Sequence, residues 1–294
     1  MFRKILVCSD TSPASNLLVQ CVGELKTIGM EEVVLGHVLQ AVHTEGLDQL
    51  LANEARSILD KQKEALEQLG IKVVTEMPVG REPARTLNDL ANKHNVSAIF
   101  IGSHGKGILR SSLLGSVTTT LLQQAERPVL LARIALLEGE KYHLVCQKMF
   151  TRVLFPTDFS VTAEHALNYL GKIAADTKCP VTIMHVLEEE PADTDVENSR
   201  LLLESKRQRL ESMGAAEVST DLASGEPAWE ILDRAKGGDF SIIVMGSTGK
   251  GFVKEVFLGS VSNEVVRRAE LPVLLIPVVQ SPFRTGAPEG RNAP

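Results

Sequence analysis

The sequence predicts an α/β protein made of two tandem domains, each a doubly wound, parallel, five-stranded sheet. Three observations lead to this prediction: the length of 294 residues, an internal repeat, and short apolar runs that alternate with amphipathic stretches. The length exceeds the usual size of one domain, so two domains of ordinary size are expected. Alternating strand and helix patterns are typical of βαβ units and of a mostly parallel sheet.

The repeat returns about 146 residues along the chain and preserves the order of its elements. Segment 4–12 resembles segment 152–160, and further matches follow in register. These pairs are His37 with His185, Glu82 with Glu226, Gly102 with Gly246, Leu114 with Leu258, and Pro128 with Pro272. The predicted domains are therefore 1–134 and 150–280. Residues 281–294, rich in Pro and Gly, are expected to form a disordered tail.

Each element of the first unit has its own signal. Strands are predicted at 3–8, 32–39, 71–77, 97–101 and 129–132. The first helix is expected to begin after Ser12, a favourable N-cap, with Pro13 in its first turn. The second helix ends before Gly70, a suitable C-cap, and carries apolar residues at helical spacing. Its predicted core stripe is Leu47, Leu50, Leu51, Ala55, Ile58, Leu59, Leu66 and Leu69.

The later elements follow the same pattern in both units. The third helix is predicted to start at Pro83 and Pro227, and the fourth at Ser116 and Ser260. The fourth strand is apolar throughout, which predicts a central strand covered on both faces. Between the units, residues 133–149 are too apolar for a free linker, so this segment is expected to pack against a domain.

Composition and charge limit the classes of function. The net charge of −6 and a pI near 5.7 predict no general affinity for nucleic acid or anionic membranes. No apolar run is long enough to span a bilayer, and the N-terminal segment is expected to be a strand, not a signal peptide. Cys8, Cys21, Cys146 and Cys179 show no C-x-x-C pair or metal-site spacing, which predicts reduced thiols, a cytoplasmic location and no metal site. The seven histidines include no H-E-x-x-H motif and are expected to be ordinary core or surface residues.

A glycine pattern follows the fourth strand in both halves. It consists of G-x-x-G, nine further residues, and G-S at the start of a helix. Its residues are Gly102, Gly105, Gly115 and Ser116 in the first half, and Gly246, Gly249, Gly259 and Ser260 in the second. Glycines allow backbone N–H groups to approach phosphate oxygens closely, and a helix N-terminus offers unpaired donors and the positive end of its dipole. The pattern predicts one phosphate-binding site in each half.

Asp10 and Asp158 follow the first strand of each half. Ligands of parallel α/β sheets bind beyond the carboxyl ends of the strands, where these carboxylates could accept hydrogen bonds from ribose hydroxyls. The alternative is an ordinary turn residue before a helix. Because an aspartate occurs at the same place in both halves, the ligand-binding role is favoured over the turn residue.

These motifs resemble the universal stress protein family in its tandem two-domain form, over nearly the whole chain except the linker and tail. The pattern of the family's ATP-binding branch, G-x-x-G-x9-G-[S/T], stands here twice. The resemblance implies a Rossmann-like fold of the adenine nucleotide alpha hydrolase type. It also implies that 129–132 and 273–276 pair to form a pseudo-dimer within one chain. The implied function is a stress-response regulator that binds ATP or AMP, with or without Mg²⁺, at one site per domain.

The resemblance also assigns roles to residues. The aspartates would hold the ribose, the backbone of Val38 and Val186 would meet the adenine edge, and the loop glycines with the helix start would hold the phosphates. The complete implied set is Asp10, Thr11, Val38, Gly102, His104, Gly105, Gly115, Ser116, Val117, Asp158, Phe159, Val186, Met245, Gly246, Thr248, Gly249, Gly259, Ser260 and Val261. Two departures predict unequal pockets, because Thr11 corresponds to Phe159 and His104 corresponds to Thr248.

Two other classes of function stay open. One is a slow ATPase or another nucleotide-dependent enzyme, although the sequence lacks the Walker motif and G-x-S-x-G. A flavin or dinucleotide carrier is disfavoured, because no G-x-G-x-x-G follows the first strand. Related α/β enzymes that activate a carboxylate by adenylation are expected to carry an S-G-G-x-D-S loop after the first strand. This chain has Cys8-Ser9-Asp10-Thr11-Ser12 there, which lacks the glycines. The other class is a scaffold with empty sites. The preferred hypothesis is a regulatory protein without catalytic residues. The sequence does not identify its protein partner, and it leaves homodimerisation of the tandem chain open.

Overall fold

The computed structural model describes residues 1–40, 47–103, 114–137, 141–144, 148–187, 190–250 and 258–277. The first half contains β1 (Lys4–Cys8), α1 (Pro13–Cys21), the 3-10 helix η1 (Val22–Ile28), β2 (Glu32–Gly36), α2 (Leu47–Gln68), β3 (Lys72–Glu76), α3 (Pro83–Lys93), β4 (Ala98–Gly102), α4 (Ser116–Gln124) and β5 (Val129–Ala132). The second half contains β8 (Val153–Pro156), α5 (Val161–Thr177), β9 (Val181–Leu187), α6 (Asp193–Ser212), β10 (Val218–Ser224), α7 (Pro227–Gly237), β11 (Ile242–Gly246), α8 (Ser260–Arg268) and β12 (Val273–Ile276).

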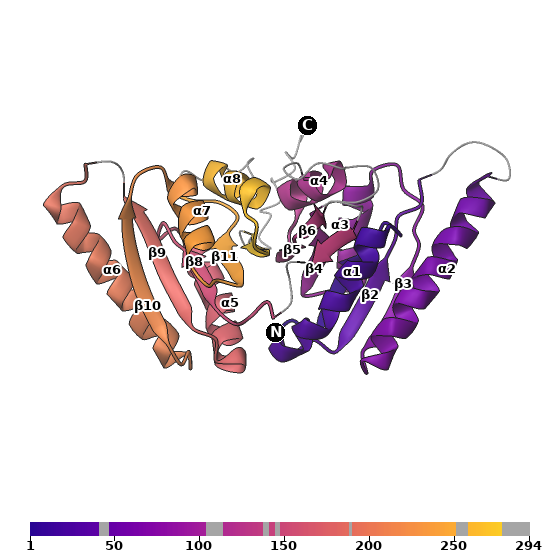
Figure 1. Ribbon diagram of the computed structural model, residues 1–294, viewed down its shortest axis with the longest axis horizontal. Coiled ribbons are helices and arrows are strands. Elements are labelled where there is room, and N and C mark those ends of the chain that lie inside the picture. The colour runs from indigo at the N-terminus through magenta and orange to yellow at the C-terminus, as the bar shows by residue number, and fades with distance from the viewer. Residues whose placement is uncertain are drawn as a thin grey trace, which may run out of the picture.

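The strands form one ten-stranded sheet that joins the two halves. Its order is β10-β9-β8-β11-β12-β5-β4-β1-β2-β3, parallel within each half. The central pair, β12 and β5, is antiparallel, with Leu274 opposite Leu130. Figure 1 shows the resulting pseudo-twofold arrangement, with α2 and α6 at opposite ends of the molecule. The predicted tandem sheets and their pairing through the last strands are confirmed.

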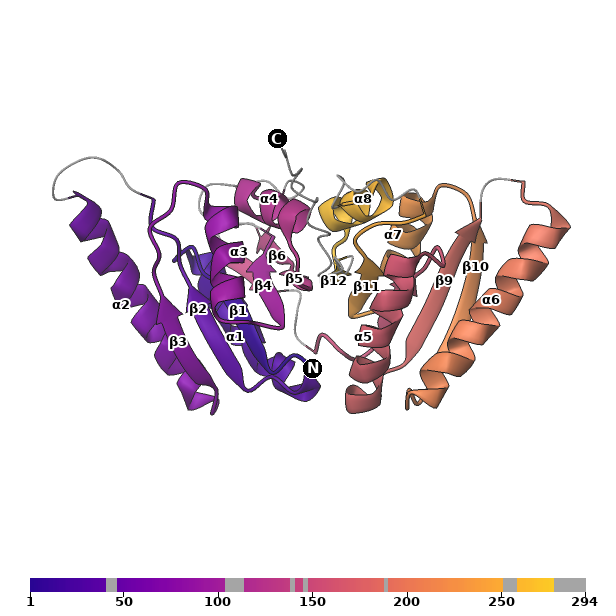
Figure 2. The ribbon, with the colours of Figure 1, turned by 180° about the vertical axis from the view of Figure 1, so that it is seen from behind.

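Helices cover both faces of the sheet, and each face has a hydrophobic core that includes residues of both halves. One core involves α1, α2, α5 and α6, and the other involves α3, α4, α7 and α8. Residues of β5 and β12 alternate between them: Leu130 and Leu274 belong to the first core, and Leu131 and Leu275 to the second. Seen from behind, α4 and α8 again lie beside one another at the centre (Figure 2). The halves therefore share a buried apolar junction.

The helix ends follow the local sequence signals. Ser12 caps α1 by accepting a hydrogen bond from the N–H of Ser15, with Pro13 as the first helical residue. Gly70, with φ of +75°, follows α2 in the left-handed region that favours glycine. The predicted core stripe of α2 is wrong in part, because Leu50 and Leu51 lie exposed near its start, as does Leu69 just after its end. Ala55, Leu59 and Leu66 are buried; the sheet covers only the middle and later turns of this long helix.

The segment between the halves forms a hairpin of β6 (Ile134–Leu137) and β7 (Lys141–Leu144). The β7 strand contacts α1, so the segment packs on the first domain as predicted. The prediction of reduced thiols is wrong for Cys21, at the end of α1, which is disulfide-bonded. Cys8 and Cys179 are free and buried, and Cys146 lies outside the described residues. Cysteine spacing did not indicate this bond, because a disulfide depends on which residues the fold brings together and not on their separation in the sequence.

The predicted tail, 281–294, lies outside the described residues. In the segments that the structure covers, no helix combines the length and the apolar character needed to cross a bilayer.

Candidate functional site

A cavity of about 380 Å³ opens at the carboxyl end of the second half's sheet. Its volume falls within the usual range for small-molecule sites. It is bounded by the ends of β8, β9 and β11 and by the first turns of α5, α7 and α8. The lining consists of Pro156, Thr157, Asp158, Ala163, Met184, His185, Val186, Pro227, Ile231, Met245, Gly246, Thr248, Gly249, Lys250, Gly259, Ser260, Val261 and Ser262.

One wall of the cavity is the N-terminus of α8. Gly259 is the N-cap residue and no side chain caps the helix. Gly259 donates its own N–H to the carbonyl of Ser247 at 2.7 Å, and Asn263 donates to the carbonyl of Gly259 at 2.8 Å. The N–H groups of Ser260 and Val261 have no hydrogen-bond partner among the described residues. Unpaired amides and the positive end of the helix dipole thus face the cavity, an arrangement that favours an anion.

Glycine permits the close packing behind this wall. A Cβ atom on Gly246 would lie 2.9 Å from Cγ2 of Thr162 and 3.2 Å from its carbonyl carbon. Real Cβ atoms essentially never approach this closely, so the end of β11 meets α5 only because position 246 is glycine. On the same side, Oγ1 of Thr162 and Oγ1 of Thr248 share a buried hydrogen bond of 3.0 Å. This bond ties the glycine-rich loop to α5.

Asp158 lies in the lining and faces the glycine-rich loop. Its Oδ1 accepts a hydrogen bond from the N–H of Ser160 at 3.0 Å, and its Oδ2 accepts one from the N–H of Lys250 at 2.8 Å. The next residue, Phe159, adopts a φ of +62°, which is costly for a bulky L residue. The carboxylate is therefore held at the cavity, by a turn that places it between the end of β8 and the loop.

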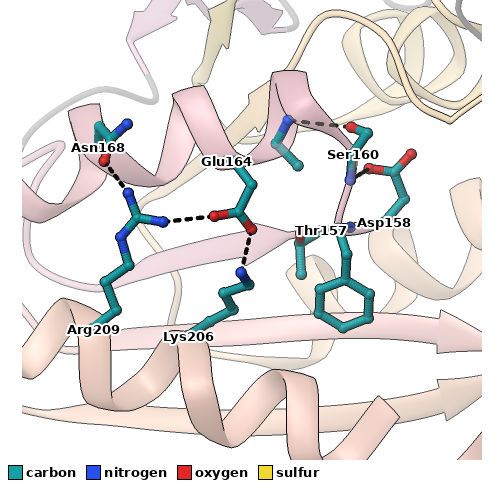
Figure 3. A network of polar contacts seen from close by, with 9 residues as sticks. Thr157, Asp158, Ser160, Glu164, Asn168, Lys206 and Arg209 are labelled. Carbon is teal, nitrogen blue, oxygen red and sulfur yellow. Dashed lines mark hydrogen bonds and ion pairs between the residues drawn. The ribbon is translucent and has the colours of Figure 1, made fainter. Parts of the chain in front are cut away.

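A second group of polar residues anchors the helix that starts at this turn (Figure 3). Ser160 caps α5 by accepting a hydrogen bond from the N–H of Ala163. In the first turn, Glu164 forms ion pairs with Lys206 at 2.6 Å and Arg209 at 2.7 Å, both on α6. The two helices are thus joined directly beside the turn that carries Asp158.

His185, on β9, is a lining residue that the sequence prediction treated as an ordinary histidine. Its Nδ1 lies 2.7 Å from the carbonyl oxygen of Thr157, so Nδ1 carries the hydrogen and donates, which leaves Nε2 as an acceptor. Burial lowers the pKa of His185, despite the opposing effect of that hydrogen bond, and favours the neutral ring. The signal that could have identified it is the repeat, because His37 occupies the same place and its Nδ1 lies 2.8 Å from the carbonyl of Ser9.

Phe159 does not belong to the lining, contrary to the prediction. Its ring lies 4.4 Å from the ring of His185 and packs against the core. Lys250 lies in the lining, with its Nζ 5.9 Å from the centre of the Phe159 ring. Phe159 therefore lies behind the cavity wall, next to Lys250, which is the single Lys or Arg among the described lining residues.

The first half repeats this geometry where it is described. Asp10 accepts a hydrogen bond from the N–H of Ser12 at 3.0 Å, and Thr11 has the same φ of +62° as Phe159. Gly115 donates to the carbonyl of Ser103 at 3.0 Å and is the N-cap of α4, which no side chain caps. In the described part of the first half, the turn after β1 and the start of α4 thus have the same local structure as their counterparts in the second half.

The predicted site residues fall into three groups. In the second half, nine of the ten predicted residues line one cavity, and Phe159 is the exception. In the first half, the structure places Asp10 and Val38 after β1 and β2, Gly102 at the end of β4, and Gly115 to Val117 at the start of α4. Strand β2 ends at Gly36, earlier than predicted, so Val38 lies in the loop that follows. His104 and Gly105 lie outside the described residues.

Comparisons with known proteins agree with this architecture. A sequence profile of the universal stress protein family matches residues 1–133 and 149–277. A universal stress protein of Mycolicibacterium smegmatis is 25% identical over 297 residues, covering 92% of this chain and 96% of that protein. The single-domain universal stress protein MJ0577 of Methanocaldococcus jannaschii is 30% identical over 155 residues, covering 44% of this chain and 95% of its own length.

A solved structure extends the match to both halves together. The crystal structure of a universal stress protein from Archaeoglobus fulgidus superimposes with a TM-score of 0.75 at 27% identity, covering 94% of this chain and 98% of that one. The profile match, the full-length relative and the shared tandem fold lead to one conclusion. The chain belongs to the universal stress protein family, with two family domains in tandem.

Proposed function

We propose that the protein binds one adenine nucleotide in each half and acts as a nucleotide-dependent regulator in the stress response. The observation that carries this proposal is the cavity of the second half. There the amides of Ser260 and Val261, the loop of Gly249 and the carboxylate of Asp158 face one space. The family's ATP-binding motif stands in both halves and supports two sites.

The lining offers a different chemistry to each part of a nucleotide. Met184, Val186, Ile231 and Met245 supply an apolar wall suited to the base. Each oxygen of Asp158 accepts one backbone N–H and retains a lone pair for a ribose hydroxyl. The α8 amides are suited to the phosphates, and the nucleotide's own phosphates with water are suited to Mg²⁺.

The expected affinity is micromolar. Hydrogen bonds to a charged group contribute about 1.5–3 kcal/mol each, and the helix end adds about 0.3–1 kcal/mol. Three or four such bonds, less the costs of desolvation and ordering, are consistent with about −8 kcal/mol, a Kd near 1 μM.

Calorimetry with ATP, ADP and AMP tests the proposal. The wild-type chain should bind two equivalents of at least one of these nucleotides. Asp10→Ala and Asp158→Ala should each remove or greatly weaken one equivalent, because each deletes one ribose contact. Asp233→Ala, an exposed residue on α7 away from the lining, is the matched control and should keep both. Absence of heat with all three nucleotides would refute the proposal and favour a scaffold function.

A further inference from the structure

Arg133, which follows β5 of the first half, reaches into the second half. Its side chain is buried, with 8% of the residue exposed, and its Nη2 donates a hydrogen bond to the carbonyl oxygen of Val266 on α8. Val266 lies in the last turn of α8, where carbonyl groups lack partners within the helix. Arg133 thus satisfies one of the unpaired carbonyls of a helix that belongs to the other domain.

The charge of Arg133 has no carboxylate partner among the described residues. The structure gives its guanidinium no ion pair, and its Nε is buried without a hydrogen-bond partner. Burial lowers the pKa of Arg133 to about 10, so the group still carries its charge at neutral pH. A cation therefore lies at the negative end of the α8 dipole, where a positive charge is stabilising.

The other end of α8 is the wall of the nucleotide cavity. Ser260 begins the helix and lines the cavity, and Val266 lies six positions later, about 9 Å along the helix axis. We propose that Arg133 is a positioning residue for the second nucleotide site: by holding the C-terminal end of α8 it fixes and strengthens the amides that receive the phosphates. This inference rests on the nucleotide site proposed above.

The repeat indicates that this contact acts in one direction. The residue of the second half that corresponds to Arg133 is Pro277, which follows β12 as Arg133 follows β5. Proline has no side-chain donor and no charge, so it cannot make the reciprocal contact to α4. The first half thus supports the second site without receiving the same support, although α4 and α8 lie together at the junction (Figure 1).

The test uses the full chain with Asp10→Ala, which leaves the second site as the one to be titrated. Adding Arg133→Gln removes the charge and keeps a side-chain donor. Its affinity for ADP should fall about two- to five-fold, the size of a helix-dipole effect. Its affinity for adenosine should stay unchanged, because adenosine carries no phosphate. Arg133→Lys should keep the ADP affinity.

Arg127→Gln is the matched control, because Arg127 also donates to a backbone carbonyl, that of Val96, but within the first half. It should bind ADP and adenosine like the Asp10→Ala chain. Equal loss of ADP and adenosine in Arg133→Gln, or no loss of either, would overturn the inference. If the Asp10→Ala chain with Arg133 intact binds no ADP, the proposed nucleotide site itself is refuted, and this result differs from a failure of the role of Arg133 alone. Circular dichroism checks that each variant folds. If Arg133→Gln does not fold, the test is made with Arg133→Lys. That variant must keep the ratio of ADP affinity to adenosine affinity of the Asp10→Ala chain, or the inference fails.

Discussion

Replacing Gly246 by alanine probes the contact on which the second cavity depends. The added Cβ would lie 2.9 Å from Cγ2 of Thr162, 3.2 Å from its carbonyl carbon and 3.3 Å from the backbone nitrogen of Ala163. Two of these atoms are backbone, so α5 and β11 must move apart. Overpacking of this kind costs about 1–3 kcal/mol. Alanine also lowers the conformational entropy of the unfolded chain relative to glycine, and this effect stabilises the folded state by about 0.4–1 kcal/mol.

The net prediction is a decrease of about 1–2 kcal/mol in the free energy of unfolding of Gly246→Ala. This corresponds to a Tm lower by about 2–8 °C for a protein of this size class. Thermal and urea unfolding should be followed by circular dichroism and by fluorescence of Trp229, the single tryptophan, which lies on α7 of the second half. The ADP affinity of the second site should fall as well, because Gly246 and Ala163 both line the cavity.

Gly237→Ala is the matched control for this substitution. Gly237 ends α7, and a Cβ there would meet nothing within 4 Å. Alanine at this helical position should leave stability unchanged or raise it by up to about 1 kcal/mol. If Gly246→Ala proved as stable as wild type and as Gly237→Ala, the close approach of β11 to α5 would not be a constraint, and the reasoning would be refuted.

Three further predictions concern the thiols, pH and turnover. In a thiol assay, Cys8 and Cys179 should react slowly in the native protein, because burial raises the pKa of both thiols. In denaturant Cys21 should react only after reduction, and reaction of all four cysteines without reduction would exclude its disulfide. Folding lowers the pKa of His185, so the unfolded chain binds that proton more readily and the free energy of unfolding should fall as pH drops below about 6.5. His185→Asn, whose amide can still donate to Thr157, should show a smaller decrease between pH 7.5 and 5 in urea unfolding, and an unchanged pH slope would contradict this. ATP turnover should stay below about 1 s⁻¹, the low end for dedicated enzymes, and faster phosphate release would restore an enzymatic function.

The sequence predicts most of this fold because local and global signals agree. Ser12 and Pro13 define the start of α1, and the apolar runs of β4 and β11 place both strands in the middle of the sheet. The repeat then makes each half a check on the other. The stripe of α2 was overestimated because helical spacing shows which face is apolar but not where the sheet stops covering it, as the exposed Leu50 demonstrates.

Most of the candidate site could also be predicted, because it depends on backbone geometry that glycines and helix starts encode. The parts that were missed depend on tertiary contacts. His185 was treated as ordinary because no motif contains it, yet β8 and β9 are neighbours and bring it to the carbonyl of Thr157. Phe159 follows the aspartate directly but turns its ring to the core, which adjacency in sequence does not reveal. Arg133 was not singled out, because its partner belongs to the other half.

The corresponding positions of the two halves also show how the repeat has diverged. In the second half, Glu164 on α5 pairs with Lys206 on α6. In the first half, Asn16 occupies the place of Glu164 and accepts a hydrogen bond from Gln62 of α2 at 2.7 Å. An ion pair and a neutral amide pair thus join the same two helices beside the two aspartates. The contact between these two helices is thus retained in both halves, while its charge is not.

The most direct test is a crystal structure of the protein in complex with ADP, from crystals grown at a saturating ADP concentration. The β-phosphate in the second half should lie within about 3.2 Å of the amide nitrogens of Ser260 and Val261, the usual limit for such hydrogen bonds. The ribose hydroxyls should contact the carboxylate of Asp158, and the first half should bind a second ADP in the same way. Electron density for ADP elsewhere, or a cavity filled by water alone at saturating ADP, would contradict this account.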